Sequence, residues 1–461
     1  MTRQETSAPV SGFGPRDRIK PAEDVRLRWG WTEASVWTDR MLTALEQGVK
    51  GGQWFSLMDK VCSEENLYCS WTKVAQNKGA PGVDHVTTDA FAKQISHNLD
   101  RLTITLRDGT YRPLDVKRVW IPKPGSKEQR PLGVPTVRDR VVQTAVRNVV
   151  EPIFERDFAE HSYGFRPGRG CKDALRRVDR LLKTGSRYVV DADLKSYFDT
   201  IPHDRLMDRI QEKISDGRVL SLIEMFLKQG VLDGLSRWTP ETGSPQGAVI
   251  SPLLSNIYLN PLDHLMAERG FEMVRYADDF VILCRTAEEA QAALAVVRAW
   301  TSENGLTLHP QKTRIVDVEV DSFDFLGYSF RREHRWPREK SLTKLKDTLR
   351  QKTKRTSGQS LQFIIRDVNR TLTGWFEYFK HSHHWTFERI DSWLRMRLRS
   401  ILRKRAGRAS RGGAAALPPP PSSNRTGRFP ASGLPENCRL EACTRISGDY
   451  RNSKPRAWRW A

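Results

Sequence analysis

The sequence predicts an α+β protein in which a large unit of mixed strands and helices precedes a set of C-terminal helices. β-Branched and aromatic runs alternate with helical stretches from Asn77 to Phe330 without a strong linker, as expected of one mixed unit. Apolar residues at helical spacing then predict three helices, over residues 342–354, 361–380 and 387–405. At 461 residues the chain is long enough for two or three domains with cores of their own.

Composition narrows the class of protein. Lys and Arg outnumber Asp and Glu by 21, which indicates a polyanionic partner, with nucleic acid favoured over an anionic membrane. No apolar run approaches the roughly 18 residues of a membrane-spanning helix, and the N-terminus has no signal-peptide pattern. The six cysteines are scattered without a C-x-x-C pair, which predicts reduced thiols and argues against a zinc site. We therefore expect a soluble cytoplasmic protein that has no membrane partner.

Three segments interrupt the periodic pattern. Residues 1–37 are polar and predicted to be mostly disordered, and a helical stretch follows from Thr38 to Cys69. Residues 331–340 form a charged connector that carries Pro337. From Ala406 the chain becomes rich in Gly, Ala, Ser and Pro, and residues 403–461 hold thirteen Lys or Arg against three acids. The tail, 406–461, is predicted to be disordered, either as a nucleic-acid-binding arm or as a frameshifted end.

The most informative segment is Val274–Leu283, which predicts a strand, a tight turn and a strand, with Asp278 and Asp279 at the turn. Both strands are apolar on both faces, so the hairpin should be buried, and a buried carboxylate pair needs compensating cations. A third acid, Asp193, ends the β-branched run that begins at Tyr188. Each acid alone is more often a cap or a surface residue. Together they suit two Mg²⁺ ions, with Mn²⁺ as a candidate substitute, about 4 Å apart in a nucleotidyl-transfer site.

Eight ordered blocks give the chain a wider resemblance. Over roughly residues 70–405 it resembles the group II intron-encoded reverse transcriptase/maturase family. The blocks that carry the resemblance are Asn77–Asp84, Arg118–Pro135, Ser162–Arg169, Tyr188–Asp199, Gly243–Gly247, Tyr276–Asp279, Leu306–Thr313 and Phe325–Tyr328.

The resemblance implies a right-hand polymerase followed by an α-helical thumb/maturase (X) domain. Residues 38–190 would form N-terminal helices and fingers, 191–335 the palm, and 336–405 the thumb. The implied activity is RNA-directed DNA polymerisation with dNTPs on an intron RNA template, from a DNA or RNA primer. Intron splicing and retrohoming into a DNA target would accompany it, and a homodimer is left open. We expect no His-Asn-His endonuclease domain, because Cys438 and Cys443 form only a single C-x₄-C pair.

The resemblance also assigns roles to residues around the carboxylates, each with a plainer alternative. Lys123 and Arg130 flank the tip of a predicted hairpin and would clamp a triphosphate, unless they only form a solvated basic surface. Phe198 would exclude a 2′-hydroxyl and select deoxynucleotides, whereas the alternative is a core ring. Gln246, in a Pro-Gln-Gly turn, would lie against nucleotide and template. Lys312 would protonate the departing pyrophosphate, or else is an exposed lysine at a strand end.

The C-terminal helices are predicted to supply both a core and RNA contacts. We interpret the aromatic stripe around Trp375 and Phe379 as core rather than as a stacking surface. Opposite the apolar side of the last helix lie basic residues suited to a phosphate backbone: Arg395, Arg397, Arg399, Arg403, Lys404 and Arg405.

Three other functions compete with this interpretation. One is an RNA-binding splicing cofactor whose polymerase is inactive. Another is a reverse transcriptase of the retron, diversity-generating or CRISPR-associated type. An RNA-dependent RNA polymerase is disfavoured by Phe198.

Overall fold

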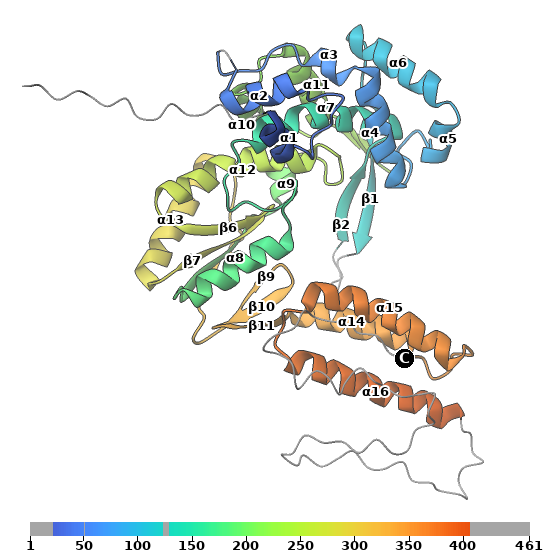
Figure 1. Cartoon of the computed structure of the whole chain (residues 1–461), viewed down its shortest axis with the longest axis vertical. Coiled ribbons are helices and arrows are strands. Elements are labelled where there is room, and N and C mark those ends of the chain that lie inside the picture. The colour runs from blue at the N-terminus through green and yellow to red at the C-terminus, as the bar shows by residue number, and fades with distance from the viewer. Residues whose placement is uncertain (1–21, 50, 123–128, 406–461) are drawn as a thin grey trace, which may run out of the picture.

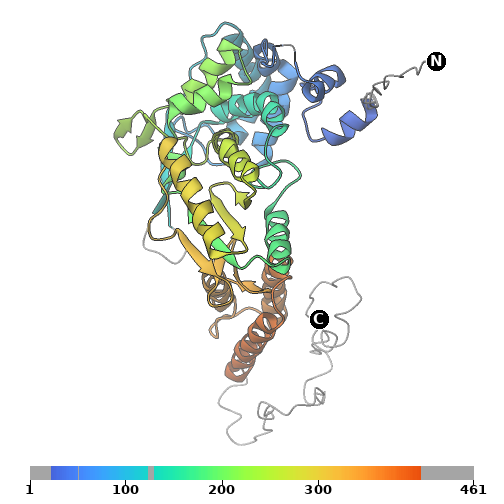
Figure 2. The ribbon, with the colours of Figure 1, turned by 90° about the vertical axis from the view of Figure 1, so that its left-hand side faces the viewer.

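The computed structural model of the chain describes residues 22–49, 51–122 and 129–405. Lys123, the predicted disorder of residues 1–21 and the predicted tail over 406–461 lie outside these ranges. The described chain is elongated, with the N-terminal helices at one end and the last three helices at the other (Figures 1 and 2).

Residues 22–37 form a helix and a packed segment, so the predicted disorder over residues 1–37 is wrong for 22–37. Helix α1 (Ala22–Arg28) precedes a segment that buries Trp29, Val36 and Trp37 in the main core. The indole N–H of Trp37 donates to the carbonyl of Asn148 at 3.0 Å, on helix α7 (Val137–Glu155). Burial of two indole rings offsets the entropy of ordering a polar segment, and this contact is too distant in sequence to be predicted from local composition.

The helical stretch predicted over residues 38–69 is broken into three helices. Helix α2 (Asp39–Gln47) is followed by Gly48, whose φ of +89° favours glycine, and then by the four-residue helix α3 and the 13-residue helix α4. The helices of this end of the molecule are α2 (Asp39–Gln47), α3 (Met58–Val61), α4 (Glu64–Gln76), α5 (Thr88–Ala92) and α6 (Ile95–Arg107).

The central sheet is antiparallel and has the strand order β6-β7-β3-β8. Alternate side chains of the strands point to opposite faces of the sheet. One face packs on helices α12 and α13 and contributes to the main core Val190, Ala192, Phe280 and Ile282. The other face packs on α8 through Val189, Val281 and Leu283. The hairpin of β6 and β7 is therefore buried from both sides, as predicted. The elements are α8 (Cys171–Lys183), β3 (Tyr188–Asp193), α12 (Ser251–Glu268), β6 (Glu272–Tyr276), β7 (Asp279–Cys284), α13 (Ala287–Glu303) and β8 (Arg314–Asp317).

A second sheet, here called the hairpin sheet, has the order β2-β1-β4-β5 and projects toward the C-terminal helices (Figure 1). Its long antiparallel hairpin contains Arg130, as predicted, and β4 runs parallel to β1. Its strands are β1 (Val116–Pro122), β2 (Gln129–Val134), β4 (Val231–Asp233) and β5 (Ser236–Trp238). Three helices lie between β3 and β4 in the sequence: α9 (Tyr197–Thr200), α10 (His203–Gln211) and α11 (Gly217–Leu227).

A three-stranded sheet, with the order β11-β10-β9, joins the central sheet to the last three helices. The sequence predicts a connector over 331–340, but β11 (His334–Pro337) pairs there with β10 (Tyr328–Arg331). Pro337 is tolerated because it ends an edge strand, where no N–H is needed. The remaining elements are β9 (Phe323–Phe325), α14 (Glu339–Lys352), α15 (Leu361–Phe379) and α16 (Trp385–Arg405), and the three helices match their predicted ranges within a few residues.

Two tyrosines tie α15 to the turn between β9 and β10. The hydroxyl of Tyr328 donates to the carbonyl of Tyr378 at 2.6 Å, and the hydroxyl of Tyr378 donates to the carbonyl of Leu326 at 2.7 Å. The ring of Phe379 lies 4.9 Å from that of Tyr328 and belongs to the same core cluster as Val281. The aromatic stripe of α15 thus contributes to the core, as predicted.

Candidate active site

The register of the central sheet brings three of the predicted acids together. Asp193 ends β3 directly opposite Asp279, the first residue of β7, so the two side chains share one face of the sheet. Asp279 pairs in turn with Tyr276, and the two-residue turn between them contains Asp278. All three carboxylates are half-buried at the end of the sheet.

Burial and mutual repulsion disfavour the ionised form of these acids, and few positive charges compensate for it. Burial, followed by the negative charges of Asp191, Asp278 and Asp193, raises the pKa of Asp279 to about 7. Burial also raises the pKa of Asp278, with a further contribution from Asp193, while the positive charges of Arg130 and Lys312 oppose it. Neighbouring carboxylates whose ionised form is disfavoured in this way are typical of a site that receives a cation.

Lys312 is the cation nearest to this site. Its ammonium group donates to Asp193 Oδ2, although its side chain is 61% exposed. Within residues 22–49, 51–122 and 129–405, no three His, Cys, Asp or Glu side chains converge as a ready-made metal site. The hard carboxylate oxygens nevertheless fit divalent ions such as Mg²⁺, which keep several waters and need few protein ligands. Binding would require Asp193 to exchange Lys312 for the metal.

A buried arginine holds the turn that carries Asp278. Arg275, on β6, is fully buried and forms an ion pair with Asp263 of α12, with Nε to Oδ1 at 2.7 Å. Its Nη1 donates both to the carbonyl of Ala277 and to Asn256 Oδ1, each at 2.9 Å. Ala277 has a φ of +61°, a left-handed conformation that costs an alanine about 1–2 kcal/mol. The Arg275 hydrogen bond therefore stabilises a strained residue next to Asp278.

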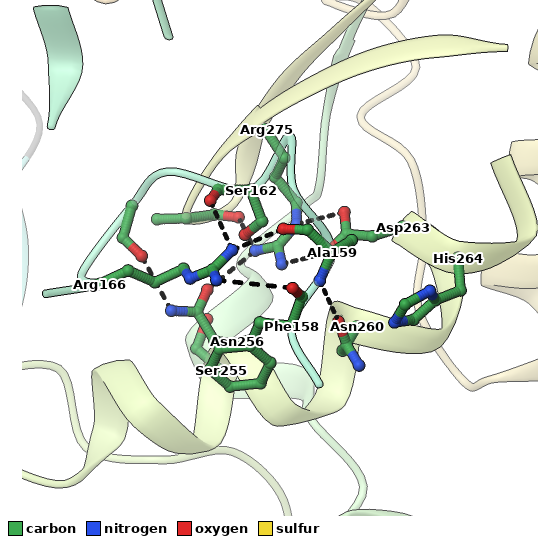
Figure 3. A network of polar contacts seen from close by, with 12 residues as sticks. Phe158, Ala159, Ser162, Arg166, Ser255, Asn256, Asn260, Asp263, His264 and Arg275 are labelled. Carbon is green, nitrogen blue, oxygen red and sulfur yellow. Dashed lines mark hydrogen bonds and ion pairs between the residues drawn. The ribbon is translucent and has the colours of Figure 1, made fainter. Parts of the chain in front are cut away.

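The block Ser162–Arg169 closes over the same turn. Tyr163 N–H donates to the carbonyl of Arg275 at 2.9 Å, and Asn256 Nδ2 donates to the carbonyl of Gly164 at 2.8 Å. A Cβ on Gly164 would lie 2.2 Å from the backbone nitrogen of Ala277, so only glycine fits there. Figure 3 shows the guanidinium groups of Arg166 and Arg275 converging in this network beside α12. No role for this packing was predicted from the sequence.

The other predicted site residues surround the carboxylates to different degrees. Arg130 is exposed on β2, and its charge acts on Asp278. Phe198 is half-buried on α9, and its carbonyl accepts from the N–H of Ser244, in the block that contains Gln246. The carbonyl of Gln246 accepts from Gly133 N–H at 2.6 Å, which ties this block to β2. Lys123 lies outside the described residues.

One acid of the site was missed in the sequence. Asp191 lies two residues before Asp193 on β3 and therefore on the same face of the sheet. Burial raises the pKa of Asp191 to about 6, and Arg314, 3.7 Å away, opposes the shift. Period-2 alternation in the Tyr188–Asp193 segment was the available signal.

The predicted basic side of α16 is only partly available to a ligand. Arg397 donates to the hydroxyl of Thr353 at 2.7 Å and Arg405 to the carbonyl of Ser357 at 3.4 Å, so both connect α16 to the segment after α14. Arg395 pairs with Asp391 at 2.7 Å. Arg399, Arg403 and Lys404 are exposed.

Comparison with protein families and known proteins identifies the chain. A family described as reverse transcriptase (RNA-dependent DNA polymerase) matches residues 121–330, and the group II intron maturase-specific domain matches residues 342–416. Protein YkfC of Escherichia coli K12 is 35% identical over 342 residues, which cover 65% of this chain and 85% of YkfC.

Two further matches cover less. Group II intron-encoded protein LtrA of Lactococcus lactis subsp. cremoris is 40% identical over 203 residues, 44% of this chain and 33% of LtrA, so the match spans a third of that protein. A solved partial Cas6-RT-Cas1–Cas2 complex matches with a TM-score of 0.36 and 24% identity over 54% of this chain and 41% of that chain.

Among the helices that the structure describes, none is both long enough and apolar enough to cross a membrane. The two family matches follow one another in the order of the predicted polymerase and thumb. The chain belongs to the group II intron-encoded reverse transcriptase/maturase family, with an RNA-directed DNA polymerase domain followed by a maturase domain.

Proposed function

We propose that the chain extends a primer with dNTPs on an RNA template, using two Mg²⁺ ions held by Asp193, Asp278 and Asp279. Reverse transcriptases use divalent metal ions, and the pair of ions would activate the attacking 3′-hydroxyl and stabilise the leaving oxygen. The observation that carries this proposal is the register of Asp193 against Asp279, next to a turn that contains Asp278.

The surrounding residues would bind and orient the substrates. Arg130, with Lys123, would bind the triphosphate, since a guanidinium group pairs well with phosphate oxygens. Phe198 would lie under the sugar and exclude a 2′-hydroxyl, and the Gln246 turn would support the templating base. Lys312, once released from Asp193, would give a proton to the departing pyrophosphate.

The wider role we propose is the mobility of a group II intron. Reverse transcriptase and maturase domains have nucleic acids as partners. The template would be the intron RNA, whose splicing the chain assists and whose copy is made at a DNA target. We propose polymerase fingers and N-terminal helices over 38–190, a palm over 191–335 and a thumb/maturase domain over 336–405, with exposed Arg399, Arg403 and Lys404 contacting RNA phosphates.

Extension of a DNA primer on an RNA template in Mg²⁺ and dNTPs tests the polymerase. Wild type should yield full-length cDNA, and Asp278→Ala should yield little or none, with a loss in rate of at least about 10²-fold expected for an electrostatic centre of this kind. Asp208→Ala, which removes an exposed acid on α10, is the matched control and should extend normally. A wild-type protein that binds structured RNA tightly without extending any primer would favour the splicing-cofactor function instead.

A further inference from the structure

Phe165 is a strained aromatic residue with an exposed side chain. Its φ is +58°, a region that bulky side chains rarely adopt, and its side chain is 48% exposed. It belongs to neither of the core clusters that flank the central sheet. A strained conformation that does not serve burial is typical of residues placed for a ligand.

The residues on both sides of Phe165 keep it in this conformation. Gly164 packs against the backbone of Ala277, with no room for a Cβ, and its carbonyl accepts from Asn256. Arg166 is almost fully buried, forms an ion pair with Glu155 at 2.7 Å and donates to the carbonyl of Ser162 at 2.8 Å. The ring is therefore held in place by its neighbours along the chain and does not depend on its own packing.

The position of the ring relates it to the carboxylates. Its centroid lies 6.3 Å from that of Tyr276, with the planes tilted by 44°. Tyr276 pairs with Asp279, and Asp279 with Asp193, so these three side chains form one row across the face of the sheet. Phe165 extends this row beyond β6, because Ser162 forms a parallel bridge with Arg275 on that edge. Lys312 contacts Asp193 at the opposite end of the row.

We propose that Phe165 binds the 3′-terminal nucleoside of the primer, with its ring against the base or sugar beside Tyr276. The inference rests on the proposed polymerase function, because a primer whose 3′-hydroxyl reaches the carboxylates must end next to this row. An exposed aromatic ring suits a nucleoside of any sequence, since every base has an apolar face. Phe165 is then a substrate-positioning residue, and the buried network around Arg166 serves to present it.

The test uses Phe165→Gly, because glycine removes both the ring and the strain. A primer–template duplex with 2-aminopurine at the primer 3′ end reports stacking without any need for catalysis. We expect Phe165→Gly to bind the duplex about tenfold more weakly and to lose the quenching of the 2-aminopurine, while kcat changes less than twofold. Its Tm should rise by about 2 °C, because the left-handed residue is relieved. Phe165→Tyr should behave as wild type.

Ser56→Gly is the matched control, since Ser56 is also exposed and has a φ of +55° but belongs to the N-terminal part of the chain. It should raise Tm similarly and leave duplex binding unchanged. Unchanged duplex binding by Phe165→Gly would overturn the inference, and so would a fall in its Tm, which would make the ring a packing element. A wild type that binds and quenches the duplex without extending it would refute the polymerase proposal and leave the role of Phe165 in binding intact.

Discussion

Replacing Arg275 should separate the stability of the fold from the placement of the carboxylate turn. Arg275→Met leaves Asp263 as a buried carboxylate with only 5% exposure and no countercharge, a change that costs about 3–5 kcal/mol of unfolding free energy. The double variant Arg275→Met/Asp263→Leu removes both charges, and apolar residues of similar volume should restore most of that stability.

The double variant should still be defective in metal binding. The charged hydrogen bond from Arg275 to the carbonyl of Ala277, at 2.9 Å, is worth about 1.5–3 kcal/mol. That is comparable to or larger than the approximately 1–2 kcal/mol cost of the left-handed conformation of Ala277, so we expect removal of the bond to let the turn relax and to move Asp278. We expect the half-saturating Mg²⁺ concentration for primer extension to rise about tenfold, which corresponds to about 1.4 kcal/mol.

Urea unfolding and Mg²⁺ titration of primer extension, measured on the same preparations, provide the assay. The half-buried pair Arg335 and Asp179 gives a matched control, since Arg335→Met/Asp179→Leu removes an ion pair, at 3.1 Å, that does not contact Ala277. It should leave the Mg²⁺ dependence unchanged. A stable Arg275→Met/Asp263→Leu protein with the Mg²⁺ dependence of wild type would refute the reasoning.

Three further predictions concern the sugar, the acids and the C-terminal helices. Phe198→Ala should increase ribonucleotide incorporation at least tenfold in primer extension with mixed nucleotides, and unchanged discrimination would exclude it as the sugar-selecting residue. The raised pKa of Asp279, about 7, means that the metal-free folded state retains a proton that the unfolded chain has lost, so this group lowers stability as pH rises from about 4 to 7. Mg²⁺ should therefore raise Tm more at pH 8 than at pH 5.5; Asp279→Asn should reduce that difference, and an equal effect of Mg²⁺ at both pH values in wild type would contradict the assignment. Tyr378→Phe removes the hydroxyl that donates to the carbonyl of Leu326 at 2.7 Å and should lower the free energy of unfolding by about 1 kcal/mol in urea; an unchanged value would contradict a stabilising role for this bond.

The sequence predicts those parts of the site that depend on local patterns. The β-branched runs around Asp193 and around Asp278 and Asp279 predict strands and a turn, and the structure has β3, β6 and β7 there. The three C-terminal helices were predicted for the same reason, since their apolar residues recur at helical spacing.

The features that the sequence did not predict depend on contacts between distant residues. Arg275 lies within a buried strand and its partner Asp263 on α12, a pairing that no local period signals. β11 becomes a strand only because β10 offers it an edge, and Arg397 turns inward because Thr353 lies beside it. Tertiary contacts override local preference at such positions.

The reciprocal tyrosine bonds between α15 and the turn at Leu326 bear on how this protein can be divided. The two family matches meet between residues 330 and 342, which invites division of the gene at that point. A chain cut there would leave an apolar socket where Phe379 completes the cluster beneath Val281. A maturase domain exchanged into this chain, in nature or by engineering, would need an aromatic side chain that fills the position of Phe379. We therefore expect the two domains to be inherited together.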